Sequence, residues 1–140
     1  MPRRVGDWVA RAVTSDASGL IALGATSIVR AYSYMPGIVN TDRLPAHWLE
    51  GLISPASWAW VWLTLGILTL VSAILPRLTP ITVGLVVALP AMWAISFMAI
   101  QIFGPNPRAY VSALGYFTVA WLAAWGFGRR RTPPPSPEVN

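Results

Sequence analysis

The chain has 140 residues, of which 55% are hydrophobic and only 11% are charged, and its net charge is +5. Soluble domains carry roughly a quarter charged residues, so this composition excludes an ordinary soluble protein and favours an integral membrane protein with several spans. The absence of cysteine excludes disulfides, thiolate nucleophiles and cysteine-ligated metal sites.

Residues 3–14 are predicted to form a short amphipathic helix on the membrane surface. Their apolar side chains recur at helical spacing, opposite a face that carries Arg4 and Arg11. Trp8 lies on the apolar face, where an indole ring can anchor the helix among lipid head groups. The basic face suits an anionic leaflet, so the lipid bilayer is the first expected partner.

The first membrane span is predicted over about 17–36, and it is the least hydrophobic of four. Four small or polar residues recur in it at every fourth position: Ser18, Ala22, Thr26 and Arg30. Because positions four apart share a helix face, this stripe is expected to face the bundle interior and to let a neighbouring helix approach closely.

The connection that follows is predicted to lie outside the cell and to contain a second interfacial helix over about 45–53, anchored by Trp48. Asp42, His47 and Glu50 occur close together in this connection. Side chains of these types can bind a metal or exchange protons, so a small site is one interpretation. The other, which we favour, is the solvated polar face of an interfacial helix.

The second span, over about 56–75, is strongly hydrophobic and begins with Trp58, Trp60 and Trp62. An aromatic cluster of this kind is typical of the membrane–water boundary, so all three are expected to be interfacial anchors. The turn to the third span, over about 80–102, is too short to cross a membrane. The third span is therefore expected to return beside the second.

The fourth span is predicted over about 109–127, with Trp125 as an interfacial anchor towards its end. Ala120, Ala124 and Gly128 repeat the four-residue spacing of small side chains. They are expected to form a second face on which helices can pack closely.

The positions of the arginines predict the orientation. Seven flank the predicted inner ends of the spans: Arg3, Arg4, Arg11, Arg77, Arg129, Arg130 and Arg131. Only Arg43 and Arg108 flank the outer ends. Basic residues gather on the cytoplasmic side, so both termini are predicted to be cytoplasmic, in a bacterial cytoplasmic (inner) membrane. This placement explains the net charge without nucleic acid as a partner.

The predicted fold class is all-α, an integral membrane four-helix bundle with short interfacial helices. It forms a single domain over 1–131. The Pro-rich segment 132–140 is expected to be a disordered cytoplasmic tail, because its prolines prevent helix formation.

The polar residues exclude several kinds of chemistry. All five acidic residues lie outside the predicted spans, whereas a proton-coupled carrier, such as the four-span multidrug exporters, needs one inside. The single histidine cannot supply a bis-histidine haem site. The hydroxyl nucleophiles have no base nearby within the membrane. We therefore expect a protein that is not an enzyme and has no catalytic, cofactor-binding or metal-binding residues.

Arg30 has two interpretations. Its long side chain could anchor the first span by reaching the outer interface, at the level of Tyr32 and Tyr34. Alternatively, Arg30 faces the bundle or a partner and pairs there with Asp42, Glu50, a backbone carbonyl or an acid from another protein.

The overall plan of short-looped spans, basic ends and a polar Pro-rich tail resembles phage and prophage holins. All ten basic residues are arginine, a coding bias typical of a GC-rich source such as an actinobacterial phage or its host. Holins share no diagnostic motif, so the resemblance implies an architecture and a mechanism only. That mechanism is accumulation in the membrane, association through small-residue faces and opening of a lesion.

Two other functions remain open at this stage. The first is a non-enzymatic accessory or inhibitory subunit that docks on a larger membrane protein complex. The second is a small channel or carrier. Analogy at the level of architecture does not decide between them.

Overall fold

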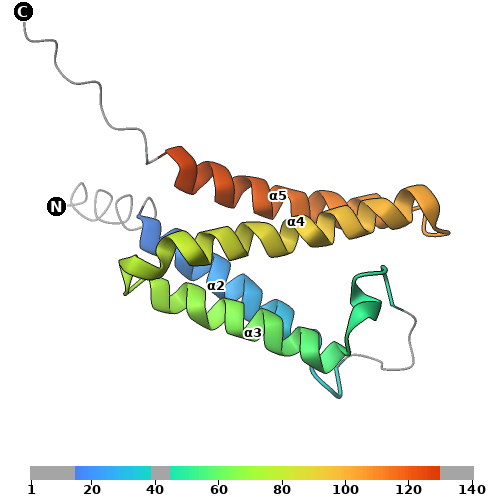
Figure 1. Cartoon of the computed structure of the whole chain (residues 1–140), viewed down its shortest axis with the longest axis horizontal. Coiled ribbons are helices and arrows are strands. Elements are labelled where there is room, and N and C mark those ends of the chain that lie inside the picture. Colours follow the sequence, from blue (N-terminus) through green and yellow to red (C-terminus); the bar gives the residue numbers. More distant parts are fainter. Residues whose placement is uncertain (1–14, 39–44, 130–140) are drawn as a thin grey trace, which may run out of the picture.

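A computed structural model describes residues 15–38 and 45–129, which contain four α-helices, two short 3₁₀ helices and no strands (Figure 1). The α-helices are α2 (Asp16–Tyr32), α3 (Pro55–Ser72), α4 (Thr79–Phe103) and α5 (Ala109–Gly128). The 3₁₀ helices are η1 (Glu50–Leu52) and η2 (Pro76–Leu78). The all-α prediction is therefore confirmed for these residues. The predicted surface helix over 3–14, with Trp8, and the tail over 132–140 lie outside them, as does Asp42.

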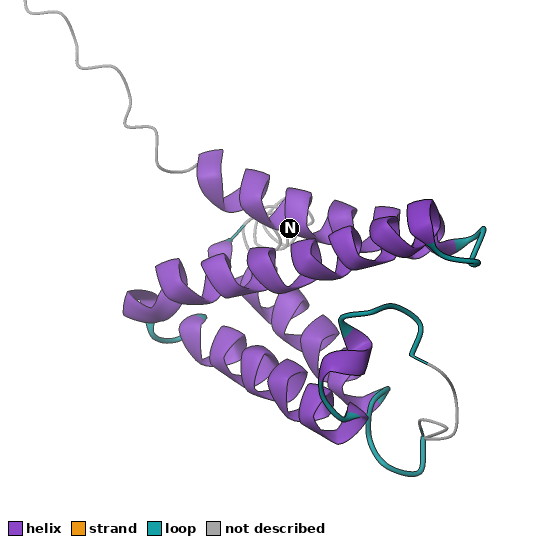
Figure 2. Cartoon of the chain, turned by 45° about the vertical axis from the view of Figure 1, so that its right-hand side comes forward, coloured by secondary structure: helices purple, strands orange, loops and turns teal. Residues whose placement is uncertain are grey.

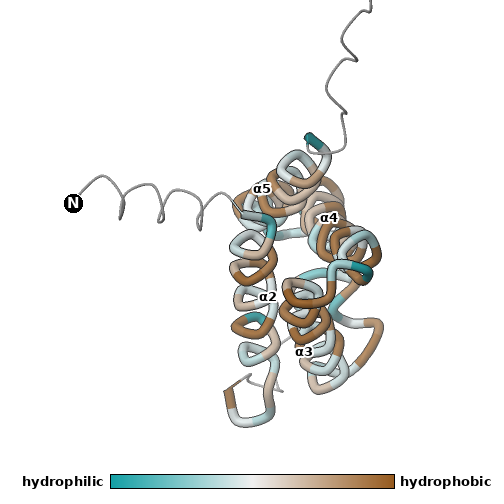
Figure 3. Tube along the Cα trace, turned by 90° about the vertical axis from the view of Figure 1, so that its left-hand side faces the viewer, coloured by the Kyte–Doolittle hydropathy of each residue, from teal (hydrophilic) through white to brown (hydrophobic). Residues whose placement is uncertain are grey.

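Three helical segments, 55–72, 76–103 and 109–128, are long and apolar enough to cross a membrane by length and composition. In Figure 3, hydrophobic residues recur along all four helices, with more polar positions on α2. Helix α2 has 17 residues, a length of about 25 Å at 1.5 Å per residue, which is less than the hydrocarbon core of about 30 Å. A multi-pass membrane protein with three candidate spans is therefore supported, and a fourth crossing by α2 stays a prediction.

Helix α2 ends at Tyr32, four residues before the predicted end of the first span. The hydroxyl of Ser33 donates a hydrogen bond to the carbonyl oxygen of Arg30 at 2.7 Å, which satisfies one group in the last turn. Pro36 then disfavours helical geometry at the preceding residue, so the chain leaves the helix in a series of turns. At its other end, α2 is capped by Ser15, whose side chain accepts from the Ser18 amide at 3.2 Å.

The helices form two antiparallel pairs. Helix α2 packs along α3, and α4 packs along α5, whereas α3 and α4 share a smaller contact and α2 and α5 make less contact still. Figure 2 shows the two pairs diverging towards the end where the loop with η1 lies. The bundle is therefore open along the edge between α2 and α5.

Two glycines allow the close contact between α2 and α3. A Cβ atom added to Gly24 would lie 2.8 Å from Cγ of Leu70 and 3.0 Å from the carbonyl oxygen of Gly66. One added to Gly66 would lie 2.9 Å from the carbonyl oxygen of Gly24. Small residues at a crossing let two helix backbones approach in this way.

This contact corrects the predicted packing faces. The residues of α2 that are buried are Leu20, Gly24, Ser27 and Ala31, whereas Ala22 and Thr26 of the predicted stripe are exposed. On α5 the buried residues are Ala109, Ala113, Ala120 and Ala123. Ala120 alone is shared with the predicted series, and Ala124 and Gly128 are exposed. Small residues do recur along both helices, but the neighbouring helix packs against a different face from the predicted one.

Candidate functional site: a buried loop and an open helix edge

The loop before α3 buries three of its side chains, those of His47, Leu49 and Glu50, in the interior. Only Glu50–Leu52 form a helical turn, so the predicted interfacial helix over 45–53 is wrong. His47 and Glu50 are 1% and 5% exposed, which also overturns the interpretation of a solvated polar face. Their burial requires hydrogen-bond partners, and the structure supplies them from the loop itself and from α4.

Ser96 on α4 holds this loop by two hydrogen bonds. Its side-chain oxygen accepts from the Leu49 amide at 3.3 Å and lies 2.8 Å from Nδ1 of His47. The Glu50 amide donates to the same Nδ1 at 3.3 Å, so this nitrogen acts as an acceptor and the hydroxyl of Ser96 donates to it. The three residues fix the loop against α4 at a point where water is excluded.

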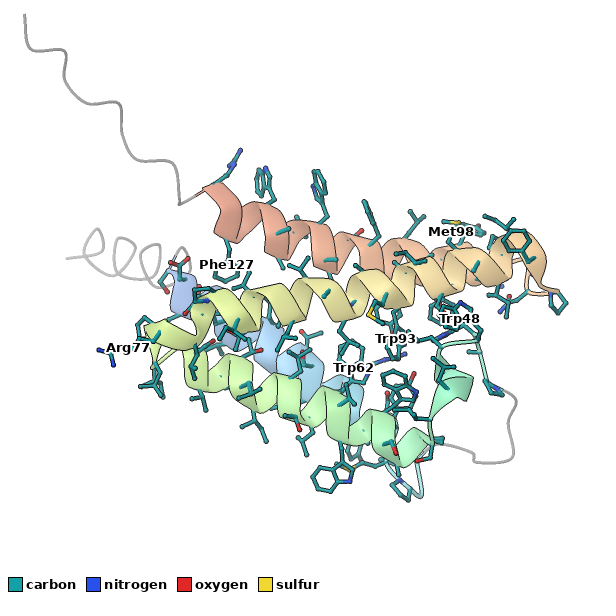
Figure 4. All side chains as sticks on the ribbon, viewed as in Figure 1. Trp48, Trp62, Arg77, Trp93, Met98 and Phe127 are labelled. Atoms are coloured by element: carbon teal, nitrogen blue, oxygen red, sulfur yellow. The ribbon has the colours of Figure 1, made fainter. Side chains whose placement is uncertain are left out.

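Aromatic rings surround the imidazole. His47 lies 5.4 Å from the ring of Trp93 and 4.3 Å from that of Phe97, measured between ring centroids. Trp93 in turn meets Trp58 edge-on at 4.4 Å and Trp62 at 5.4 Å. Figure 4 shows Trp62 and Trp93 in the space between α3 and α4. Edge-to-face packing of this kind stabilises a core beyond its apolar burial.

This cluster changes the assignment of the tryptophans. Trp58 and Trp62 are 7% and 4% exposed and belong to the core, so their prediction as interfacial anchors is corrected. The remaining described anchors, Trp48, Trp60 and Trp125, have exposed side chains, which is the placement that anchoring requires. The tryptophans at the start of this span therefore include both core residues and exposed residues.

Arg30 points towards the chain's own aromatic residues. Its Nη2 donates to the hydroxyl of Tyr34 at 3.2 Å. Its guanidinium carbon lies 5.0 Å from the centroid of the Tyr34 ring and 5.2 Å from that of Tyr116, both within the range of a cation–π interaction. The Nε atom of Arg30 is buried and has no hydrogen-bond partner among the described residues.

Tyr34 is affected by the charges of both Arg30 and Glu50. Burial raises the pKa of the Tyr34 hydroxyl, the charge of Arg30 lowers it, and the charge of Glu50 raises it. The hydroxyl, which accepts a hydrogen bond from Arg30, therefore stays protonated at neutral pH. The Glu50 carboxylate accepts from the amide of Ala46 at 2.6 Å. One cation and one anion are thus held at a fixed relative position.

Both charged groups line a cavity of about 550 Å³, here called the polar cavity. Its wall also contains Tyr34, Phe97 and Tyr116. Nearer the start of α2, a second hollow of about 680 Å³ lies between α2 and α5, here called the α2/α5 groove. It is lined on α2 by Ser18, Ala22 and Thr26 and on α5 by Ala123, Gly126 and Phe127, among others.

A small cavity of about 70 Å³ lies further inside, among residues of all four helices. It shares Thr26 and Val119 with the α2/α5 groove, and Arg30 and Tyr116 with the polar cavity. The residues that line the two hollows follow the open edge between α2 and α5, with Arg129 in the α2/α5 groove and Glu50 in the polar cavity. The predicted stripe on α2 lines this edge rather than a closed interior.

The structure also brings together a serine and a base, which corrects the prediction that the hydroxyl groups have no base nearby. Ser96 and His47 are in hydrogen-bond contact, the geometry of an activated nucleophile. However, they are 0% and 1% exposed, and neither lines the polar cavity. A nucleophile must reach its substrate, so this pair serves to hold the loop. No sequence signal could have identified it, because the two residues are 49 positions apart.

Within the described residues, no group of three or more histidine, cysteine, aspartate or glutamate side chains could hold a metal ion. Searches with protein-family models, among curated proteins and among solved structures find no match to this chain.

Proposed function

We propose that this chain is a non-enzymatic, multi-pass protein of the bacterial cytoplasmic membrane, with both termini inside, that acts by self-association in the manner of a holin. The observation that supports this proposal is the open edge between α2 and α5, along which small residues face outward. In a closed four-helix bundle these two helices would pack against each other.

The surface of the α2/α5 groove is suited to another helix. Ser18, Ala22 and Thr26 present small side chains, and their spacing leaves room for a backbone to approach. The hydroxyl of Thr26 donates to the carbonyl oxygen of Ala22 at 2.9 Å, and that of Ser18 donates to the carbonyl oxygen of Ser15 at 2.8 Å. These hydroxyl donors are satisfied within α2, so covering them with apolar atoms carries little cost.

Ala124 and Gly128 lie outside the lining of the α2/α5 groove, so the groove is tested at Ala22 on α2 and Gly126 on α5, which both line it. Ala22 is exposed, and a Cβ atom added to Gly126 would meet nothing within 4 Å. Leucines at these positions therefore fit the isolated protomer and would obstruct only a neighbouring molecule. They separate an effect on association from an effect on folding.

The test is the double variant Ala22→Leu/Gly126→Leu, expressed with two fluorescent labels on separate copies. Self-association, read as energy transfer in membranes, should fall, and the delayed collapse of membrane potential after induction should come later or not at all. Gly84→Leu is the matched control, because Gly84 lies on α4 with open space around it. It should behave like the wild type.

The opposite result would favour the accessory-subunit function. If expression of the wild type were tolerated indefinitely and the protein were recovered in fixed stoichiometry with one host membrane complex, self-association would not be its activity.

A further inference from the structure

The α2/α5 groove carries one charge of each sign at the same end. Figure 1 shows that α2 begins and α5 ends at the same end of the molecule, and Asp16 and Arg129 both line the groove there. Both residues are exposed, and the guanidinium carbon of Arg129 lies 3.7 Å from the centroid of the Trp125 ring. An arginine stacked on an aromatic ring keeps its N–H donors for a carboxylate, so Arg129 is positioned for an acidic partner.

The membrane restricts how a second copy can meet this groove. This inference rests on the proposed function, in which all copies share one orientation in the bilayer. A symmetric pair is then related by a two-fold axis along the membrane normal. Because α2 and α5 run in opposite directions, this axis places α2 of each copy against α5 of the other. The four helices then alternate in direction around the axis and close the open edge of both copies.

The charges of the groove complement themselves in this arrangement. We propose that a second copy of this chain fills the α2/α5 groove through the two-fold contact, with Arg129 of each copy beside Asp16 of the other. The two signs alternate around the inner end of the four helices, so like charges lie on the diagonals. Asp16 already has a partner within its own chain, and a carboxylate can accept from several donors at once. An apolar occupant, such as a lipid tail, would bring no acid to Arg129.

The walls of the groove also complement each other in size. On α5, Leu122 and Trp125 line the groove and are exposed, whereas Ser18 and Ala22 on the α2 wall are small. In the two-fold pair, the large side chains of each α5 face the small side chains of the other copy's α2. The hollow of about 680 Å³ gives them room, and the small residues let the helix backbones approach. The shape of the groove therefore favours α5 of a second copy as its occupant.

The first experiment is cysteine cross-linking in the full-length chain, which has no cysteine of its own. Ala22 is six residues from Asp16 and Leu122 is seven from Arg129, so both lie roughly 10 Å from the inner end of the groove at 1.5 Å per residue. Two tagged copies, one with Ala22→Cys and one with Leu122→Cys, are expressed together and oxidised in membranes. They should form a disulfide-linked pair. Ala22→Cys with Gly84→Cys is the control, because Gly84 lies near the start of α4, outside the groove.

The second experiment exchanges the charges between copies. Arg129→Glu places an acid beside Asp16 of the partner subunit, and Asp16→Arg places two cations together, so each variant alone should associate more weakly by about two- to fivefold for each ion pair lost. When the two variants are expressed together, each contact between them again joins opposite charges, and association should recover. A defect in the folding of one chain would not be repaired by the other, so recovery reports the contact between copies.

Three results would overturn this proposal. A disulfide between Ala22→Cys and Gly84→Cys, with none between Ala22→Cys and Leu122→Cys, would show a head-to-tail contact with α4. Failure of the two charge variants to recover when they are mixed would exclude the contact between Asp16 and Arg129. Energy transfer between wild-type copies without either disulfide would exclude the groove as the interface and leave the proposed function intact. Absence of energy transfer would instead refute the proposed function itself, and the two-fold contact with it.

Discussion

The contact between Gly24 and Gly66 makes a strong prediction about stability. In Gly66→Ala, the new Cβ would lie 2.7 Å from Cγ1 of Ile28 and 2.9 Å from the carbonyl oxygen of Gly24. The Ile28 side chain can rotate, but the backbone oxygen cannot. The two helices must therefore separate by about 0.5 Å to restore an ordinary contact of 3.4 Å.

The cost of this separation follows from overpacking, which destabilises by about 1–3 kcal/mol. The higher helix propensity of alanine stabilises the helix by up to about 1 kcal/mol relative to glycine and offsets part of this cost. We expect a net loss of about 1–2 kcal/mol, a factor of roughly 5–30 in the folded-to-unfolded ratio. The measurement is reversible unfolding in mixed micelles with increasing dodecyl sulfate, followed by tryptophan fluorescence.

Gly84→Ala is the control with the opposite sign. A Cβ atom at Gly84 meets nothing within 4 Å, so only the gain in helix propensity remains, and this variant should be neutral or more stable by up to about 1 kcal/mol. If Gly66→Ala proved as stable as Gly84→Ala, the close crossing of α2 and α3 would be refuted.

Three further predictions use other parts of the chain. Ser96→Ala should destabilise the protein by about 1–3 kcal/mol, because the Leu49 amide loses its side-chain partner and the buried His47 loses one of its hydrogen bonds. Hydrogen exchange in the loop should become faster, and unchanged exchange would contradict the buried contact. Single cysteines at Asp42 and Thr132 test the orientation: an impermeant reagent added to intact cells should label position 42 and not 132, and the reverse would invert the topology. Burial raises the pKa of Tyr34 above its ordinary value of 10.0, so as pH rises the unfolded chain loses the Tyr34 proton at a lower pH than the folded protein does. The free energy of unfolding should therefore fall as pH rises above about 10, and Tyr34→Phe should make that fall shallower. An equal fall in both proteins would exclude Tyr34 as its source.

The sequence alone predicted the elements that depend on local properties. The spans over 56–75, 80–102 and 109–127 correspond to α3, α4 and α5, and each ends within three residues of the prediction. Continuous apolar runs, bounded by proline and glycine, are sufficient for this result, because helix formation and insertion into lipid depend on residues within one segment. The sequence also marked Arg30 as a candidate for a specific role, because it is a charged residue within an otherwise apolar segment.

The partners of each helix face were decided by the tertiary structure. In a membrane helix, hydrophobic residues cover both the lipid-facing and the buried sides, so the pattern does not show which stripe meets a neighbour. Gly24 packs against α3 while the regular stripe through Ala22 lines an open edge, and Trp62 enters the core while Trp60, two positions earlier, remains exposed.

The loop that contains His47 and Glu50 shows most clearly that tertiary contacts do not follow from the local sequence. His47 and Glu50 had the composition of a solvated interfacial segment, and the loop is buried because Ser96, Trp93 and Phe97 on α4 provide its hydrogen bond and its aromatic surroundings. A polar side chain is stable in the protein interior only when a hydrogen-bond partner lies at the correct distance. That distance depends on how two segments far apart in the chain are packed.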